Sequence, residues 1–236
     1  MEERASSRGR LITIEGPDGA GKSSQAIRLA EALRERGHRV TLVREPGGTA
    51  LGEAIRGLLL SDSVDHDAPA DALLFNAARA QLVTDVIRPS LSRGDVVICD
   101  RFTDSTLAYQ GYGAGLERRW LEQLNDWATD GLRPDLTLLL DLPSEEGLRR
   151  RESGPESERT RFERAGRHDA DFHRRVREGY VELAAGEPER WRVVDATAPA
   201  QALAAELFRL VSEFVAPDGE VPARDEPIGA SVRITQ

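Results

Sequence analysis

Residues 15–24 read EGPDGAGKSS, a stretch with three glycines, one lysine and two serines. Gly16, Gly21, Lys22 and Ser23 fit G-x-x-x-x-G-K-[ST] at full spacing. The motif stands between an apolar run, RLITIE at 10–15, and a helical pattern, QAIRLAEALRER at 25–36. Its glycines let successive N–H groups face phosphate oxygens, and the helix N-terminus adds its dipole. We therefore predict a loop that holds a nucleoside triphosphate, because a plain glycine-rich turn gives the lysine no partner.

The residues assigned to this loop are Gly16, Pro17, Asp18, Gly19, Ala20, Gly21, Lys22, Ser23 and Ser24. Within it, Lys22 is expected to reach the β- and γ-phosphates, and Ser23 to ligate Mg²⁺. GTPase switches, ATP-driven motors and small-molecule kinases share such a loop, so the rest of the chain must choose among them.

Four further apolar runs predict strands, and they alternate with helical patterns. The strands are expected at 39–45, 95–100, 135–141 and 191–196, and the helices at 51–60, 71–91, after Pro143, at 169–185 and at 199–214. This order predicts an α/β protein with the P-loop NTPase fold, a five-stranded parallel sheet with helices on both faces. We expect one domain over 10–214, with flexible segments at 1–9 and 215–236.

The composition narrows the class of protein. With 236 residues and a net charge of −9, the chain lacks the basic face that a nucleic-acid backbone demands, so we expect no nucleic acid partner. The N-terminus has no apolar signal core, and no apolar run approaches the roughly 20 residues of a membrane span. Cys99 is the chain's single cysteine, which suits a reducing compartment. We expect a cytoplasmic protein with no membrane partner.

Asp100 and Arg101 follow the strand VVICD and are expected beside the phosphate loop. An aspartate there can hold Mg²⁺, so the metal ligands are predicted to be Ser23 and Asp100. An arginine there can clamp a second phosphate group, although a structural ion pair at a strand end is the alternative. The guanine-reading N-K-x-D that a switch GTPase requires is missing from the sequence.

Residues 149–168, RRRESGPESERTRFERAGRH, form an arginine-rich segment. Its arginines are Arg149, Arg150, Arg151, Arg159, Arg161, Arg164 and Arg167. Like charges at this density repel one another unless an anion binds, and the glycines suit a mobile lid. The alternative is a solvated helical face in which the four glutamates pair with the arginines.

Six segments together resemble the thymidylate kinase family, over residues 10–214. They are EGPDGAGKSS, REPGGT, LLFNAAR, DRFTDSTLAYQG, RPDLTLLLD and TRFERAGRHDADFHRRVREGYVELA. The resemblance implies transfer of the γ-phosphoryl group of ATP, with Mg²⁺, to dTMP, and a homodimer formed through helix faces in 71–91 and 103–130. Thr160 departs from the family, which often has aspartate there, so the geometry of the lid is open.

The resemblance also implies roles for individual residues. Phe75 would stack on thymine and Arg79 would hydrogen-bond the base, with Thr106 and Gln110 at its border. Tyr109 would lie against the sugar's 2′ carbon and exclude a ribose hydroxyl. Lys22, Asp18, Arg101 and Arg161 are the predicted catalytic residues. The predicted dTMP site comprises Asp18, Glu45, Pro46, Phe75, Arg79, Asp100, Arg101, Ser105, Thr106, Tyr109 and Gln110.

Three other functions fit parts of this pattern. A deoxynucleoside kinase pairs a phosphate loop with a similar lid but accepts the neutral nucleoside. An adenylate kinase usually has Gly-Thr after the lysine, where Ser23 and Ser24 stand here. A nucleotide-binding module without catalysis would not need Lys22, Asp100 and Arg101 together.

Overall fold

The computed structural model describes residues 8–61, 66–152 and 170–216. Five parallel strands form a single sheet in the order β2-β3-β1-β4-β5. The strands are β1 (Arg10–Glu15), β2 (Val40–Arg44), β3 (Val96–Asp100), β4 (Leu136–Asp141) and β5 (Trp191–Asp195). Each predicted strand is confirmed within about a residue, because strands buried on both faces read as continuous apolar runs.

The helices follow the predicted alternation. They are α1 (Lys22–Glu35), α2 (Ala50–Leu60), α3 (Ala68–Leu82), α4 (Arg88–Ser92), α5 (Thr103–Thr106), α6 (Arg118–Thr129), α7 (Ser144–Glu152), α9 (Ala170–Gly186) and α10 (Ala200–Val215), with π-helical turns η1 (Val83–Ile87) and η2 (Leu107–Gly113). The helix expected over 71–91 is confirmed, since α3, η1 and α4 form one uninterrupted helical run; its middle, η1, is π-helical, which was not predicted. None of the helices within the described ranges combines the length and apolarity of a membrane span.

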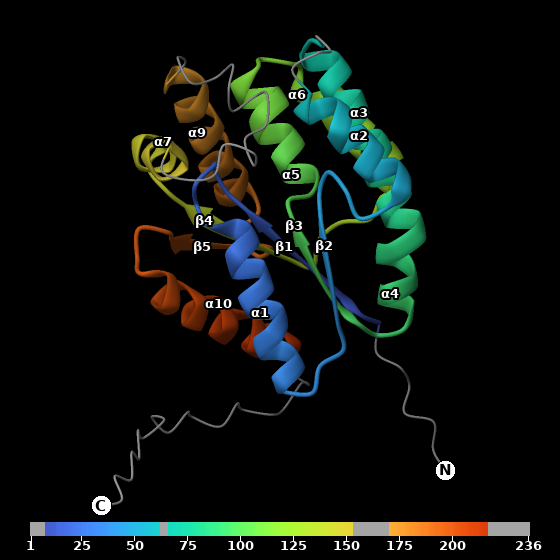
Figure 1. Ribbon diagram of the computed structural model, residues 1–236, viewed down its shortest axis with the longest axis vertical. Helices are drawn as coiled ribbons and strands as arrows, with labels where there is room; N and C mark the ends of the chain where they lie inside the picture. The colour runs from blue at the N-terminus through green and yellow to red at the C-terminus, as the bar shows by residue number, and fades with distance from the viewer. Residues whose placement is uncertain (1–7, 62–65, 153–169, 217–236) are drawn as a thin grey trace, which may run out of the picture.

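Alternate residues of the strands face two apolar layers. Ile12 and Ile14 point toward α1 and α10, which lie side by side (Figure 1). Leu11 and Val97 point the other way, toward α3, η1 and α4. The prediction of helices on both faces is therefore confirmed. Because all strands run the same way, their carboxyl ends share one edge, where ligands of such sheets bind.

The described structure extends slightly past both ends of the predicted domain. Gly9 is buried and its N–H bonds to Leu91 O at 2.9 Å, so the chain is already packed before β1 begins. At the other end α10 extends to Val215. The flexible segments predicted at 1–9 and 215–236 fall mostly outside the described residues, and the division of the chain stays a prediction.

Candidate active site

The loop after β1 is packed backbone to backbone against α7. Gly19 has φ +78°, and a Cβ added there would collide with the carbonyl oxygen of Gly147. A Cβ on Gly147 would in turn collide with Asp18 O. Conformation and close approach thus both require glycine at position 19, and the same holds at Gly16, where φ is +144° and an added Cβ would meet Leu140 O.

The loop ends at the N-terminus of α1, whose N-cap is Gly21 in the left-handed region with φ +85°. A glycine cap has no side chain to occupy the first amides of the helix, which leaves them available to an anion. Lys22 lies in this first turn, and its Nζ donates to Pro17 O at 2.8 Å. Burial lowers the pKa of Lys22 to about 8, with the charge of Arg101 as the second cause.

Ser23 and Asp100 meet across the ends of β1 and β3. Ser23 Oγ donates to Asp100 Oδ2 at 2.5 Å, while the buried Asp100 Oδ1 has no hydrogen-bond partner among the residues that the structure describes. A buried carboxylate oxygen without a partner is costly and suits a cation or its water. These two residues therefore fit the Mg²⁺ site predicted from the sequence.

Asp18 and Arg101 form an ion pair that joins the phosphate loop to the end of β3. Arg101 Nη2 also faces Tyr109 Oη at 3.3 Å, and its Nη1 faces Ser105 Oγ at 3.3 Å. The guanidinium lies 4.9 Å from the centre of the Tyr109 ring. Four residues assigned from two segments, EGPDGAGKSS and DRFTDSTLAYQG, thus form one cluster.

Arg101 itself has φ +69°, in the left-handed region that residues other than glycine seldom adopt. Its N–H donates to Ile14 O at 3.0 Å. The next N–H, of Phe102, donates to Glu15 Oε1 at 2.7 Å. Glu15 is a buried residue that the sequence reasoning missed, although it directly precedes Gly16 in the motif.

Arg79 and Glu45 form a buried ion pair at the next strand end. Arg79 Nε donates to Glu45 Oε2 at 2.8 Å, and Arg79 Nη2 donates to Phe102 O at 3.0 Å. Its Nη1 faces three acceptors, which are Asn76 Oδ1 at 3.0 Å, Thr106 Oγ1 at 3.0 Å and Asn125 Oδ1 at 2.9 Å. Burial raises the pKa of Glu45, and Arg79 opposes that shift.

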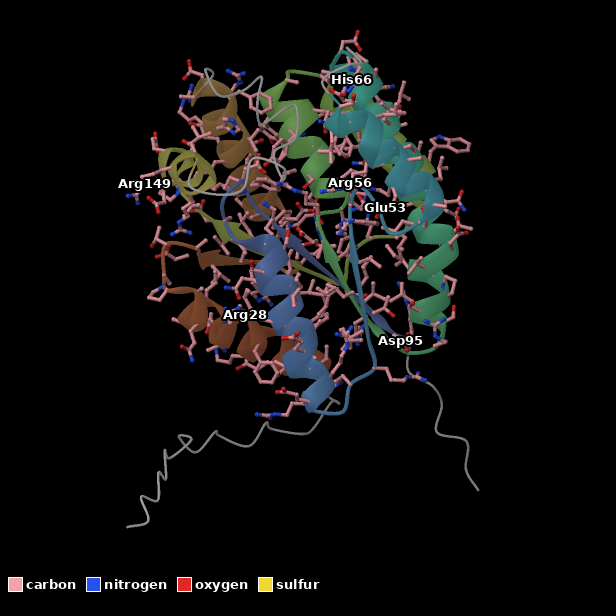
Figure 2. All side chains as sticks on the ribbon, viewed as in Figure 1. Arg28, Glu53, Arg56, His66, Asp95 and Arg149 are labelled. Atoms are coloured by element: carbon pink, nitrogen blue, oxygen red, sulfur yellow. The ribbon has the colours of Figure 1, made fainter. Side chains whose placement is uncertain are left out.

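The loop REPGGT, which carries Glu45 and Pro46, is held by α2. Arg56 Nη1 donates to Pro46 O at 3.1 Å, and Glu53 Oε1 accepts from Gly48 N at 2.9 Å. Figure 2 shows Glu53 and Arg56 on α2 beside this loop. The loop that was expected to border the acceptor pocket is therefore anchored from its outer side.

The remaining assigned residues occupy the helices around this edge. Phe75 on α3 is half-buried and packs against the apolar cluster of Ile55, Leu59 and Ala78. Gln110, in η2, is buried. Neither position alone tests the base contacts expected of them.

Only the start of the arginine-rich segment lies within the described residues. Arg149 and Arg150 are on α7, where both pair with Glu146. Arg149 lies at the periphery of the view in Figure 2 and is exposed. Arg159, Arg161, Arg164 and Arg167 lie outside the described residues, so the lid stays a prediction.

Comparison with known proteins agrees with this geometry. The family model for thymidylate kinase matches residues 14–207. The chain belongs to the thymidylate kinase family. The thymidylate kinase of Deinococcus radiodurans is 49% identical over 207 residues, 88% of this chain and 98% of the relative. That of Thermomicrobium roseum is 50% identical over 205 residues, 87% of this chain and 95% of the relative.

A solved structure shows the same likeness. The crystal structure of the thymidylate kinase from Ehrlichia chaffeensis has a TM-score of 0.69 and 35% sequence identity, covering 86% of this chain and 99% of that chain. The predicted family and fold class are thereby confirmed. As a member of the thymidylate kinase family, the chain is an ATP-dependent kinase that phosphorylates dTMP to dTDP.

Proposed function

We propose that phosphoryl transfer takes place where the ends of β1 and β3 meet, with the ATP triphosphate in residues 16–24 and the dTMP phosphate against Arg101. The observation that carries this proposal is the Asp18–Arg101 ion pair. This ion pair joins the loop proposed to bind the ATP triphosphate to the arginine proposed to bind the dTMP phosphate. The γ-phosphate of ATP and the phosphate of dTMP would therefore lie next to each other. Such positioning supplies much of the catalysis in phosphoryl transfer.

Lys22 is the proposed ligand of the transferring group. Its ammonium group donates to Pro17 O, a neutral acceptor. An ATP phosphate is a stronger, charged acceptor, so the ammonium would exchange one for the other. Its charge would then balance the negative charge on the phosphoryl oxygens during transfer.

Ser23 and Asp100 would hold Mg²⁺, which would supply positive charge to offset the negative charge of the triphosphate. The partnerless Asp100 Oδ1 supports this assignment, since a direct or water-mediated bond to the metal would satisfy it. The Ser23 hydroxyl would exchange its present bond to Asp100 Oδ2 for a bond to the metal through its oxygen.

Glu45, Pro46, Phe75, Arg79, Thr106 and Gln110 are the proposed surroundings of the thymine base. Arg79 Nη1 carries two hydrogens but faces three acceptors. A base oxygen would therefore compete with protein groups for an N–H that is already shared. The Glu45 contact, made through Nε, can persist and keep the guanidinium oriented.

Two assignments concern the sugar and the lid. Tyr109 lies beside Arg101, which supports a place for its ring next to the sugar of a dTMP bound there. Arg161 is proposed as the lid arginine that meets the phosphoryl group in flight.

We also propose a homodimer through α2, α3 and α6. These helices are grouped together in Figure 1 and expose large apolar side chains, namely Leu51, Leu58, Leu73 and Trp127. Leu73 and Trp127 fall within the segments that the sequence assigned to the interface. A cytoplasmic location is proposed as well, since the buried Cys99 is a free thiol.

The test is ADP release in a coupled assay with dTMP, thymidine or AMP as the acceptor. We expect ADP with dTMP from the wild type, and almost none from Lys22→Ala. Thymidine turnover without dTMP turnover would indicate a deoxynucleoside kinase. ADP release that no acceptor stimulates would contradict phosphoryl transfer altogether.

A further inference from the structure

Glu15, the last residue of β1, is completely buried and accepts hydrogen bonds from two distant elements. Its Oε1 accepts from Phe102 N at 2.7 Å. Its Oε2 accepts from Ser105 Oγ at 2.6 Å and from Tyr180 Oη, on α9, at 3.0 Å. Burying a carboxylate costs free energy, and three donors converge on this one. We therefore ask what Glu15 does for the neighbouring site.

The first consequence concerns the backbone of Arg101. The N–H groups on either side of its φ and ψ bonds, of residues 101 and 102, bond to consecutive residues of β1. The first uses the carbonyl of Ile14, and the second uses the side chain of Glu15. A left-handed arginine persists only where its surroundings fix it, and Glu15 supplies one of these two fixed points.

The second consequence concerns the Arg101 side chain. Its Nη1 lies 3.3 Å from Ser105 Oγ and 3.5 Å from Tyr180 Oη, the two hydroxyls that also reach Glu15. The two hydroxyl oxygens are also 2.8 Å apart. An ionised carboxylate only accepts, so a hydroxyl hydrogen turns toward Glu15, directly or through the other hydroxyl, and oxygen lone pairs turn toward Arg101. Glu15 thereby sets the polarity of the surface against which the guanidinium rests.

We propose that Glu15 is a positioning residue for acceptor binding, which holds Arg101 in place through Phe102 N, Ser105 and Tyr180. This inference rests on the proposed role of Arg101 as the clamp on the dTMP phosphate. Glu15 does not touch the substrate; its effect passes through Arg101.

Glu15→Gln is the sharpest variant because it keeps the shape and changes one acceptor into a donor. If the amide nitrogen faces the hydroxyls, it donates to their oxygens and their hydrogens must turn away from residue 15; if it faces Phe102, two N–H groups oppose each other. Either orientation loses part of the arrangement. Thr13→Val is the matched control, since Thr13 lies two residues earlier in β1, is buried, and bonds to Thr137 at 2.9 Å.

The measurement is the dissociation constant of dTMP by calorimetry at pH 8, with ATP affinity and melting temperature alongside. At this pH most of the carboxylate is ionised, because burial, and then the charge of Asp104, raise the pKa of Glu15 to about 7. We expect Glu15→Gln to weaken dTMP binding about tenfold, while ATP binding changes less than about twofold. Thr13→Val should leave both affinities unchanged.

A double-mutant cycle tests whether the effect passes through Arg101. In the Arg101→Ala background, Glu15→Gln should change dTMP affinity less than about twofold. An equal loss in both backgrounds would overturn the inference, as would wild-type dTMP affinity in Glu15→Gln. If Glu15→Gln fails to fold, Tyr180→Phe replaces it in the same double-mutant cycle with Arg101→Ala. Tyr180→Phe should then weaken dTMP binding in the wild-type background and have little effect in the Arg101→Ala background. Wild-type dTMP affinity in Arg101→Ala would instead contradict the clamp role.

Discussion

Arg79 and Glu45 form an ion pair in which both side chains are almost fully buried, with Arg79 Nη2 and Glu45 Oε2 2.7 Å apart. The guanidinium has protein acceptors on all three nitrogens. It therefore links the end of β2 to α3, to the turn after β3 and, through Asn125, to α6. A residue assigned to base recognition is also part of the core.

Arg79→Ala should accordingly destabilise the fold as well as weaken dTMP binding. The substitution leaves the Glu45 carboxylate buried without its partner, which costs about 3–5 kcal/mol of unfolding free energy. Urea unfolding followed by circular dichroism measures the loss. Arg209→Ala is the control, because Arg209 pairs with two exposed glutamates of its own helix, α10. This substitution should leave the unfolding midpoint unchanged. A fully stable Arg79→Ala protein would contradict the structural role.

Lys22 predicts a specific dependence of ATP use on pH. Its folded-state pKa, lowered to about 8 by burial, lies below the ordinary value of 10.5, and only the protonated amine attracts phosphate. The value of kcat/KM for ATP reports ionisations of the free enzyme, so it should fall as pH rises above about 8. Measurement from pH 7 to 10 checks this limb.

Lys22→Arg supplies the control for that profile. Arginine stays charged throughout this range, so the variant should have lower activity but no decline that begins near pH 8. A wild-type profile that is flat to pH 10 would show that Lys22 keeps its proton, and that ATP binding depends on another group.

Tyr109 is expected to discriminate against the ribose analogue of dTMP by its ring. Tyr109→Phe loses the contact between the hydroxyl and Arg101 but keeps the ring, so it should lower overall activity and preserve the ratio of kcat/KM values for the two sugars. Tyr109→Ala removes the steric barrier, and the ratio should narrow by about tenfold or more. Steady-state kinetics with both substrates on both variants decides the matter; an unchanged ratio in Tyr109→Ala assigns the selectivity to another residue.

The sequence was sufficient for features whose cause is local. Residues 16–24 and the buried strands could be predicted because each depends on neighbouring residues: a glycine-rich turn, or a continuous apolar run. The location of residues at the strand ends could then be predicted from the topology, since parallel strands have their carboxyl ends at one edge of the sheet. Asp100 and Arg101 were correctly expected beside the loop for this reason.

Features that depend on distant partners could not be predicted in the same way. Glu15 accepts a hydrogen bond from Tyr180, 165 residues later in the chain, and the sequence around Glu15 gives no indication of that contact. The burial of Arg79 depends on Asn125, 46 residues away, while helical spacing alone makes an arginine on α3 a surface charge. The π-helical turn η1 was missed because one extra residue in a turn barely disturbs an apolar periodicity.

Arg161 is the arginine of segment 149–168 that we expect to act on the transition state. An arginine that meets the phosphoryl group mainly during transfer lowers kcat when removed and barely changes ATP affinity. Arg161→Ala should show this pattern, and Arg161→Lys should recover only part of the activity, because lysine lacks the forked donors.

Alanine variants at Arg159, Arg164 and Arg167 are the controls for that assignment. A larger loss of kcat at Arg159 would assign the role to that residue, two positions before Arg161. This alternative arises because Thr160 replaces the aspartate that is usual in the family. Equal small losses at all four positions would show a solvated, salt-bridged surface instead of a lid.

Trp127 provides the test of the dimer. Its side chain is 87% exposed on α6, the helix whose opposite side carries the buried Leu121 and the Asn125 that bonds to Arg79. If α6 faces a second copy, Trp127→Glu places a charge in an apolar contact and should convert the dimer to a 25.9 kDa monomer in sedimentation analysis. Val193→Glu is the matched control, because Val193 is 57% exposed on β5, away from the proposed interface, and should leave the dimer intact. If the wild type sediments as a monomer, or if the Trp127→Glu protein stays dimeric, α6 is not part of a dimer interface. The exposed Trp127 would then not contact a second copy of the chain.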